Sequence, residues 1–340
     1  MLMAAALRET GYAVELWSEA IHPQYVSDAQ PVAMLHETAL ASPHDVLIYH
    51  HRLTWPMGEH LLTVSKNRLI LRHYGSPPKE AYAPYSSIHM HAAESSACSI
   101  QRILALKEIR VLGVSPFVCE NSASPAGREC EALPSFHRTE ELYHAPLDEA
   151  MASRYGGYRN IVLAGTVLPY RGHARAIRAF AEYRRHFQPD SQLILAGRVP
   201  SGLDGYVRVL NHLAGSLGVR EKVHFTGALN ASQAKALYKS AAVFLCASEY
   251  EGFSESLLEA MRLEVPIVAL AGTSVSETVG YGSVLDEWDE FVFASHMARL
   301  IEESDLARRS IDKGRRRYFN NFYPAVLSRA LDRIAQKWMS

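Results

Sequence analysis

The sequence predicts an α/β fold of two domains, each a doubly wound parallel sheet, that face one another across a cleft. Short apolar runs rich in β-branched residues alternate with longer runs of helical period, as in "NIVLAGTV" followed by "HARAIRAF". Several of these runs are apolar throughout, which is typical of strands covered by helices on both faces of their sheet. A chain of 340 residues is also longer than one hydrophobic core usually organises.

The expected strands differ in regularity between the two halves of the chain. The first half offers "AVELW", "DVLIYH", "RLILRHY" and "RVLGVS", with a helix near 94–108. The second half offers "NIVLAGTV", "QLILAG", "KVHFTG", "AAVFLCAS" and "PIVALAG", separated by helices. Polar, helix-poor sequence over 122–157 lies between the halves, with "YGGY" as the expected hinge. We therefore expect an N-terminal domain over 1–155 and a C-terminal domain over 156–322.

The last helix is expected over 324–338, because a proline suits the first helical turn. Its apolar side chains fall on one face: Leu327, Leu331, Ile334 and Trp338. Such a face needs a partner, and we expect residues 323–340 to pack back toward the N-terminal domain.

Charge and hydropathy exclude several classes of partner. The formal net charge is -1 and the pI is near 7.0, so no overall field favours nucleic acid. The run "KGRRRY", Lys313 to Tyr318, is either a solvated helix surface or a peripheral contact with anionic lipid head groups. No apolar run has the length of a membrane span, and "MLMAAAL" meets charge too early for a signal peptide. We expect a cytoplasmic protein, with the inner face of the cell membrane as a place of contact.

The cysteines and histidines give no metal motif. The four cysteines show no C-x-x-C spacing, and reduced thiols are expected. The "HH" and "HMH" pairs lack a carboxylate or thiol at ligand spacing, so we expect no metal site.

The first informative strand-to-helix junction is "VLAGTVLPYRGHARAIRAF". The strand ends at Gly165, a loop carries Arg171, and a helix opens after Gly172. A cation beside a helix N-terminus suits a phosphate group, although an ordinary turn with a surface arginine is the alternative. Neither a dinucleotide fingerprint nor a P-loop motif occurs here.

The second junction, "EYEGFSESLLEAM", places Glu251 in a loop and Glu259 in the following helix. Ser254 is placed to cap that helix, and the amides of 252–255 would point at an anion. A pyrophosphate flanked by carboxylates that accept from sugar hydroxyls describes a nucleotide-sugar. In the alternative, Glu259 pairs with Arg262 on a wet surface. A third junction, "ALAGTSVSETVG", is mainly structural and lines the same crevice.

These motifs resemble retaining, GT-B-fold glycosyltransferases of family four, also called glycosyl transferases group 1. "EYEGFSESLLEAM" is similar to the E-x7-E signature of that family. "RGHARAIRAF", "VHFTGAL", "AAVFLCASEYEGF" and "SETVG" follow in the family's order over about 160–280. Weaker similarity in "DVLIYHH" and "LRHYGSPP" points to bacterial polysaccharide mannosyltransferase-like members. The resemblance implies two Rossmann-like domains.

The resemblance also implies donor-binding roles for the second junction. Glu251 would lie against the donor sugar ring, and Glu259 would hold the ribose hydroxyls. The backbone amides of Gly252 and Phe253 would lie near the sugar and the phosphate.

Further roles follow for the first junction and for the N-terminal domain. Arg171 stands where the family usually has a lysine that neutralises the diphosphate. His73 matches a histidine that reaches the donor sugar from the opposite domain, which makes Glu251, His73 and Arg171 the expected catalytic residues. The remaining expected donor contacts are Gly165, Thr166, Gly172 and Ser254.

The chain departs from the family pattern at several positions. Thr166 replaces an arginine, Glu255 and Ser256 replace an apolar-proline pair, and Glu264 stands where a helix-ending glycine is common. "MAAALRETGYAVELW" resembles the first helix and second strand, which leaves an N-terminal domain without its first strand. Because that strand is normally interior, its absence should expose pairing edges.

The expected function is retaining transfer of a hexose, with mannose among the candidates, in bacterial surface polysaccharide synthesis. The donor would be GDP-mannose or a UDP-hexose, and the acceptor a glycan or lipid-linked saccharide. Helix amides and Arg171 would stabilise the leaving diphosphate without metal or cofactor. Two alternatives stay open. One is a glycoside hydrolase that uses Glu251 and Glu259. The other is a nucleotide-sugar-binding partner subunit with weakened activity.

Overall fold

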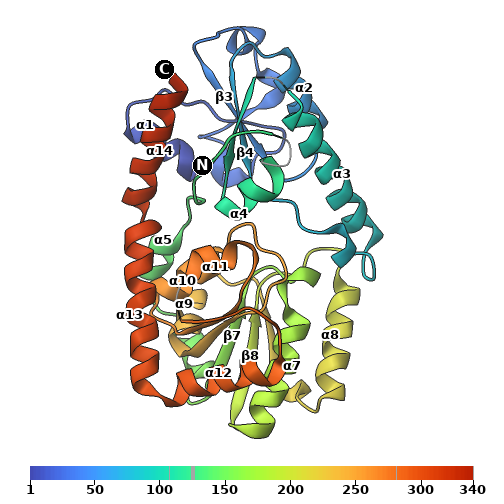
Figure 1. The fold of residues 1–340 in the computed structure, drawn as a ribbon, viewed down its shortest axis with the longest axis vertical. Coiled ribbons are helices and arrows are strands. Elements are labelled where there is room, and N and C mark those ends of the chain that lie inside the picture. The colour runs from blue at the N-terminus through green and yellow to red at the C-terminus, as the bar shows by residue number, and fades with distance from the viewer. Residues whose placement is uncertain (107, 124–126, 281, 340) are drawn as a thin grey trace. The chain divides into compact units, whose positions relative to one another are not determined.

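The computed structural model describes residues 1–106, 108–123, 127–280 and 282–339 and divides the chain into two compact units (Figure 1). Each ladder between the named strands is parallel, which confirms the expected α/β class. Unit 1 consists of Met1–Ser76, Glu94–His137 and Asn321–Ser340. Unit 2 consists of Pro77–Ala93 and Arg138–Asn320.

The units are divided at other places than the expected boundary after residue 155. After the earlier segment Pro77–Ala93, the chain returns to unit 2 at Arg138, because α5 and α6 pack against α9 of that unit. The expected hinge "YGGY" begins at Tyr155, which is buried. Residues 124–126 of the expected linker lie outside the described part of the chain.

Unit 2 contains a six-stranded parallel sheet that accounts for all five strands expected in the second half. Its strands run in the spatial order β9 (Val223–Gly227), β8 (Ser191–Ala196), β7 (Arg159–Ala164), β10 (Ala241–Cys246), β11 (Ile267–Leu270) and β12 (Ser283–Leu285). The chain therefore winds outward from β7 in one direction and from β10 in the other, which makes the β7–β10 boundary the topological switch point. Strand β12, which the sequence did not predict, has only three residues.

Helices surround this sheet and form the larger core. They are α5 (Thr139–His144), α6 (Glu149–Tyr155), η7 (Pro169–Arg171), α7 (His173–His186), α8 (Asp204–Ser216), η8 (Arg220–Lys222), α9 (Ala231–Ser240), α10 (Glu255–Arg262), α11 (Thr273–Val279), α12 (Glu290–Glu302) and α13 (Ser304–Asn321). The apolar side chains of α7 are buried, and Ile177 and Phe180 are fully inaccessible. They belong to one cluster with Leu195 of β8. Burial of such side chains on both faces explains the uninterrupted apolar runs of these strands.

Unit 1 has two separate parallel sheets instead of one. The larger sheet has the order β3 (Val46–His51), β4 (Arg68–His73), β5 (Ile109–Gly113) and β6 (Cys130–Ala132). The smaller sheet contains only β1 (Trp17–Ser18) and β2 (Gln30–Pro31). The expected strand "AVELW" is reduced to its last residue, and β3 is left at the edge of its sheet. This break is what an N-terminal domain without an interior strand would show.

The helices of unit 1 lie on both faces of the β3–β6 sheet. They are α1 (Leu2–Glu9), α2 (Pro56–Val64), α3 (Ser87–Leu104), α4 (Pro116–Val118) and α14 (Pro324–Met339), and α3 begins in unit 2. Unit 1 also contains the short helical turns η1 (Pro23–Tyr25), η2 (Val32–Met34), η3 (Glu37–Leu40) and η5 (Cys119–Ala123). The turn η4 (Lys79–Ala81) belongs to unit 2. The apolar stripe of α14 packs against α1, with Trp338 and Leu7 in one cluster. Arg68 of β4 donates to the carbonyl of Trp338 at 2.6 Å, which ties the last helix to the sheet.

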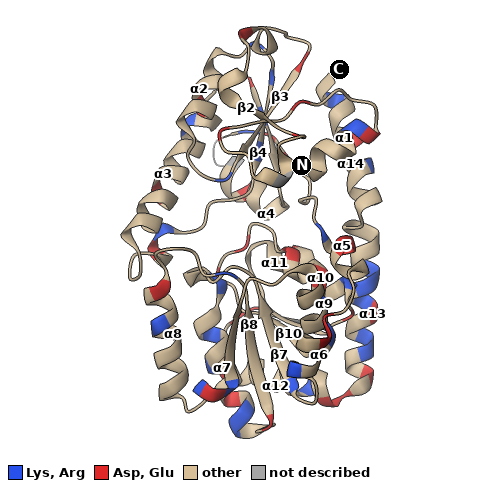
Figure 2. Cartoon of the chain, turned by 180° about the vertical axis from the view of Figure 1, so that it is seen from behind, with Lys and Arg blue, Asp and Glu red and all other residues tan. Residues whose placement is uncertain are grey.

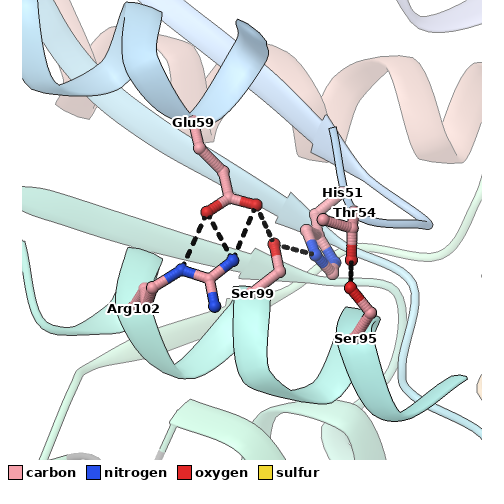
Figure 3. Close-up of polar contacts among 6 residues, drawn as sticks. All are labelled: His51, Thr54, Glu59, Ser95, Ser99 and Arg102. Carbon is pink, nitrogen blue, oxygen red and sulfur yellow. Dashed lines mark hydrogen bonds and ion pairs between the residues drawn. The ribbon is translucent and has the colours of Figure 1, made fainter. Parts of the chain in front are cut away.

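A polar network joins β3, α2 and α3 within unit 1 (Figure 3). The Arg102 guanidinium donates to both oxygens of Glu59 at 2.8–3.2 Å, and the Ser99 hydroxyl donates to the same carboxylate at 2.7 Å. Because the Ser99 proton is used there, His51 donates from Nε2 to Ser99 at 3.1 Å. Burial lowers the pKa of His51, so this ring is neutral. The neighbouring His50 instead meets the hydroxyl of Tyr74 at 2.8 Å, so the "HH" pair shares no common partner.

The cysteine expectation is wrong for two of the four residues. Cys119 and Cys130 form a disulfide with a Cα–Cα distance of 5.4 Å, whereas Cys98 and Cys246 are free. The sequence spacing gave no sign of this pair, because β6 returns beside η5 only in the folded sheet.

Among the described residues, no helix combines the length and the apolar character needed to cross a bilayer.

Candidate functional site

Three strand-to-helix junctions meet at the switch point of the unit 2 sheet. The amide of Glu249, after β10, donates to the carbonyl of Tyr170, after β7, at 2.8 Å. The amide of Ser274, after β11, donates to the carbonyl of Glu251 at 3.1 Å. The loops singled out in the sequence are therefore tied together at the carboxyl ends of adjacent strands, where doubly wound sheets bind ligands.

Two glycines allow this close approach of backbone to backbone. Gly172 has φ 74°, and a Cβ built there would lie 2.0 Å from the carbonyl oxygen of Ala247. Gly197 has φ 153°, and its Cβ would lie 1.9 Å from the carbonyl oxygen of Gly165. Any side chain at these positions would push the loops apart. The turn that carries Arg171 is thereby pressed against the end of β10.

The two principal expected residues form an ion pair. Arg171 Nη1 lies 2.7 Å from Glu251 Oε1, and the Ser248 hydroxyl donates to the same oxygen at 2.8 Å. The Glu251 side chain is only 2% exposed, whereas that of Arg171 is 23% exposed. Two donors therefore fix the orientation of the carboxylate, and the guanidinium keeps a solvent-accessible side.

The charge state of this pair follows from burial and mutual attraction. Burial raises the pKa of the Glu251 carboxyl, and Arg171 and Ser248 limit that rise. Burial lowers the pKa of Arg171, but the Glu251 carboxylate outweighs it and keeps the guanidinium charged. The Nε–H of Arg171 is buried and has no hydrogen-bond partner in the described part of the chain. An unused donor of this kind suits an anionic acceptor from a ligand.

Glu259 has a different environment from Glu251. The Tyr238 hydroxyl, on α9, donates to Glu259 Oε2 at 2.7 Å. Burial, reinforced by the Glu255 charge and opposed by Tyr238, raises the pKa of Glu259 to about 7. The alternative pairing with Arg262 is wrong, because Arg262 pairs with Glu140 at 2.7 Å. Glu259 is thus held by a hydroxyl and not by a cation.

The start of α10 keeps the position expected from sequence but not the expected cap. Ser254 is the residue before the helix, yet its hydroxyl makes no cap hydrogen bond and instead meets Ser256 Oγ at 3.1 Å. Gly252 is buried and Phe253 is half-buried in the loop that leads there.

The loop after β7 supplies the remaining expected donor contacts. A Cβ on Gly165 would lie 3.3 Å from Arg171 Nη1, so that glycine leaves room for the guanidinium. Thr166 is half-buried in this loop and carries no charge where the family has an arginine.

His73 belongs to unit 1, whereas the residues described above belong to unit 2. It ends β4, is 1% exposed, and meets Ser122 Oγ through Nε2 at 3.0 Å. Its Nδ1 has no partner among the described residues. Burial and the neighbouring His51 lower the pKa of His73 to about 3. This imidazole is therefore neutral, and its role toward a donor sugar remains a prediction.

Two site residues were missed by the sequence reasoning. Ser248 lies three positions before Glu251, and Tyr238 lies on the helix that precedes β10. Serine and tyrosine at such positions have no distinctive spacing, and only the fold brings their hydroxyls to the two carboxylates.

Comparison with known proteins gives the same family as the sequence resemblance. Residues 149–317 match the family described as "Glycosyl transferases group 1". The MMP alpha-(1->4)-mannosyltransferase of Mycolicibacterium hassiacum is 29% identical over 213 residues, which cover 58% of this chain and 50% of that protein. The GDP-mannose-dependent alpha-(1-6)-phosphatidylinositol monomannoside mannosyltransferase of Mycolicibacterium smegmatis is 31% identical over 238 residues, 64% of this chain and 60% of that protein. The chain thus spans about half the length of the curated relatives it matches.

Solved structures extend the similarity of fold to both units. The structure of Anabaena Alr3699/HepE in complex with UDP and glucose has a TM-score of 0.71 and 16% identity, covering 98% of this chain and 88% of that one. At this identity the match concerns the fold alone.

Proposed function

Because residues 149–317 belong to the glycosyl transferases group 1, we propose that the chain transfers a hexose from a nucleoside diphosphate sugar to a saccharide acceptor. The observation that carries this proposal is the Arg171–Glu251 ion pair at the switch point of the unit 2 sheet. It places a cation and an oriented carboxylate beside the starts of two helices, where unpaired backbone amides favour anions.

The proposed chemistry depends on stabilising the leaving diphosphate. Negative charge grows on that group as the bond to the sugar breaks, and Arg171 is a fixed donor that can neutralise it. The first amides of α10 add a positive end of a helix dipole. Glu251 would accept a hydroxyl of the donor sugar, and Glu259 would accept from the ribose. In this proposal no metal or other cofactor takes part.

The stereochemical course is proposed as retention. The acceptor hydroxyl would attack on the face from which the diphosphate departs, and a phosphate oxygen would take its proton. This course needs no protein nucleophile. The hydrolase alternative has less support, because Arg171, which is bound to Glu251, and the helix N-termini suit an anionic phosphate that glycoside hydrolysis does not involve.

The donor is proposed to be GDP-mannose or a UDP-hexose. The two mycobacterial relatives carry mannosyltransferase names, one of them GDP-mannose-dependent, whereas the Anabaena structure was solved with UDP and glucose. The proposal therefore includes both guanine and uracil as the base of the donor. As acceptor we propose a glycan or lipid-linked saccharide of bacterial surface polysaccharide synthesis.

Contact with the inner face of the cell membrane is proposed for α13 (Figure 2). Lys313, Arg315 and Arg316 are exposed, as an electrostatic contact with anionic head groups requires. Arg317 is not available for this contact, because its Nε donates to the carbonyl of Thr278 at 2.9 Å. Co-sedimentation with phosphatidylserine vesicles should fall as salt rises from about 50 to 500 mM, because salt screens the attraction between exposed charges. Equal sedimentation with neutral vesicles would exclude this contact.

The function is tested by titrating the purified chain with GDP-mannose and UDP-glucose and measuring release of the nucleoside diphosphate. Arg171→Met should weaken binding of the active donor at least tenfold, whereas Arg185→Met, at the far end of α7, should leave it unchanged. Binding of a nucleotide-sugar without release, across a panel of saccharide acceptors, would identify a partner subunit and contradict transfer. Release of free sugar from an oligosaccharide without nucleotide would identify a hydrolase.

A further inference from the structure

An apolar groove of about 910 Å³ runs along the outer edge of β3 in unit 1. The groove is lined by β3, from Val46 to His50, and by the stretch from Tyr12 to Glu19, which contains β1. Within the described residues, no strand pairs with this edge of β3, and β1 pairs only with β2. The groove is therefore bordered by two strand edges that lack a partner on the side facing it.

Helices cover the groove on both faces of the sheet. Leu7 of α1 and Trp338 of α14 line it on one face, and Leu62 of α2 with Trp55 lines it on the other. The side chains of β3 alternate in the same way, because Val46 and Ile48 pack with the first group while Leu47 and Tyr49 pack with the second. A strand placed in the groove would thus be buried on both faces, as interior parallel strands are.

We propose that this strand groove binds one extended, predominantly apolar peptide segment of a partner protein, which pairs with β3 as a parallel strand. The backbone edge selects an extended chain over other apolar ligands, because unpaired N–H and C=O groups along it need partners at regular spacing. The six residues of β3 set the length at about six residues, or roughly 20 Å. Burial on both faces requires apolar side chains at successive positions and excludes the alternation of a half-exposed strand.

The occupant is a peptide and not a second copy of this chain or a lipid. A second copy would need a free apolar strand to insert, and the apolar strands of the described chain are all paired within its own sheets. A lipid chain would fill the apolar space but leave the β3 edge without hydrogen bonds.

The test uses the 340-residue chain and a fluorescent peptide of six valine and isoleucine residues flanked by lysines. We expect saturable binding by anisotropy, a melting temperature that rises with peptide concentration, and slower hydrogen exchange at alternate β3 amides. In the paired peptide, every second residue directs its backbone N–H toward β3. Peptides N-methylated at those residues should bind about tenfold more weakly, since they lose hydrogen-bond donors but keep their apolar surface.

Matched variants locate the binding. Ile48→Lys places a charge in the groove, and Leu35→Lys does so at a half-exposed lining position with less risk to folding. Both should weaken peptide binding at least tenfold, whereas Val209→Lys on the exposed side of α8 should not. Equal binding of the N-methylated peptides would show simple apolar filling and overturn the proposal. Absence of peptide binding by a folded chain, or dimerisation that Leu35→Lys abolishes, would overturn it too.

Discussion

The strands of the two units differ in how completely they are paired. In unit 2, six consecutive strands pair without a gap, and glycines at the switch point let the loops of β7, β8 and β10 approach backbone to backbone. In unit 1, six strands are divided into groups of two and four, with a groove between them. In unit 2, strand pairing brings side chains of different loops within hydrogen-bond distance of one another. In unit 1, the edge of β3 pairs with no strand of the described chain and can still accept one.

Leu→Ala substitutions in β8 and β3 should give the largest difference between the two units. Leu195→Ala, at a fully buried position of β8, should lower the free energy of unfolding by about 3–5 kcal/mol, because a tightly packed site cannot collapse around the cavity. Leu47→Ala, at a half-buried position of β3 that lines the groove, should cost about 1 kcal/mol. Urea unfolding of both variants measures the difference. Equal costs would mean that the groove does not loosen packing around β3.

The ion pair at the switch point should matter more for activity than for folding. Glu251→Gln keeps the shape of the side chain but removes its charge, so donor turnover should fall about 10²–10³-fold. Glu249→Gln is the matched control, because this exposed carboxylate lies in the same loop as Glu251 and is 3.5 Å from Arg175 of α7. Nucleoside diphosphate release measures both. Near-normal turnover in Glu251→Gln would remove this residue from the proposed site.

Binding of the nucleotide should depend on pH through Glu259. Its pKa is about 7, so the carboxyl gains a charge and acceptor capacity as the pH rises from 6 to 8. Affinity for the donor should rise several-fold over that range if Glu259 accepts from ribose hydroxyls, and Tyr238→Phe should move the midpoint upward by removing a donor to the carboxylate. Calorimetric titration at several pH values measures this. A pH-independent affinity would assign Glu259 a structural role.

The smallest expected effect is a gain in stability at Glu264. This residue follows α10 with φ 63°, a left-handed conformation that disfavours side chains. Glu264→Gly should raise the free energy of unfolding by up to about 1 kcal/mol by relieving that strain. The side chain contributes little in return, since it is 47% exposed and lies 3.8 Å from Arg315. A lower melting temperature in the variant would show that this contact outweighs the strain.

The sequence was most informative where the molecule is most regular. The strands of unit 2 were predicted from uninterrupted apolar runs, and the loops of Arg171 and Glu251 from their places after strands. The Glu264 departure also matched a real feature, since the residue adopts the conformation that a glycine would take.

The features that the sequence did not predict depend on contacts between distant segments. Arg262 could not be assigned to Glu140, 122 positions away, from helical spacing alone. Ser248 and Tyr238 each contribute one hydroxyl group, and a single serine or tyrosine forms no sequence motif from which that contact could be predicted. The Cys119–Cys130 pair forms because β6 lies beside η5, and the division at Arg138 follows from the packing of α5 and α6 on α9.

The direct contact between Arg171 and Glu251 has a consequence for selectivity in the proposed reaction. A ligand that takes the guanidinium away from the carboxylate must offer Glu251 a replacement donor, or a buried charge loses its partner. An intact sugar nucleotide brings a phosphate together with the hydroxyls of its hexose, whereas the spent nucleotide has lost the hexose and keeps only the ribose hydroxyls that the proposal assigns to Glu259. The pair would therefore favour retention of the substrate and release of the product.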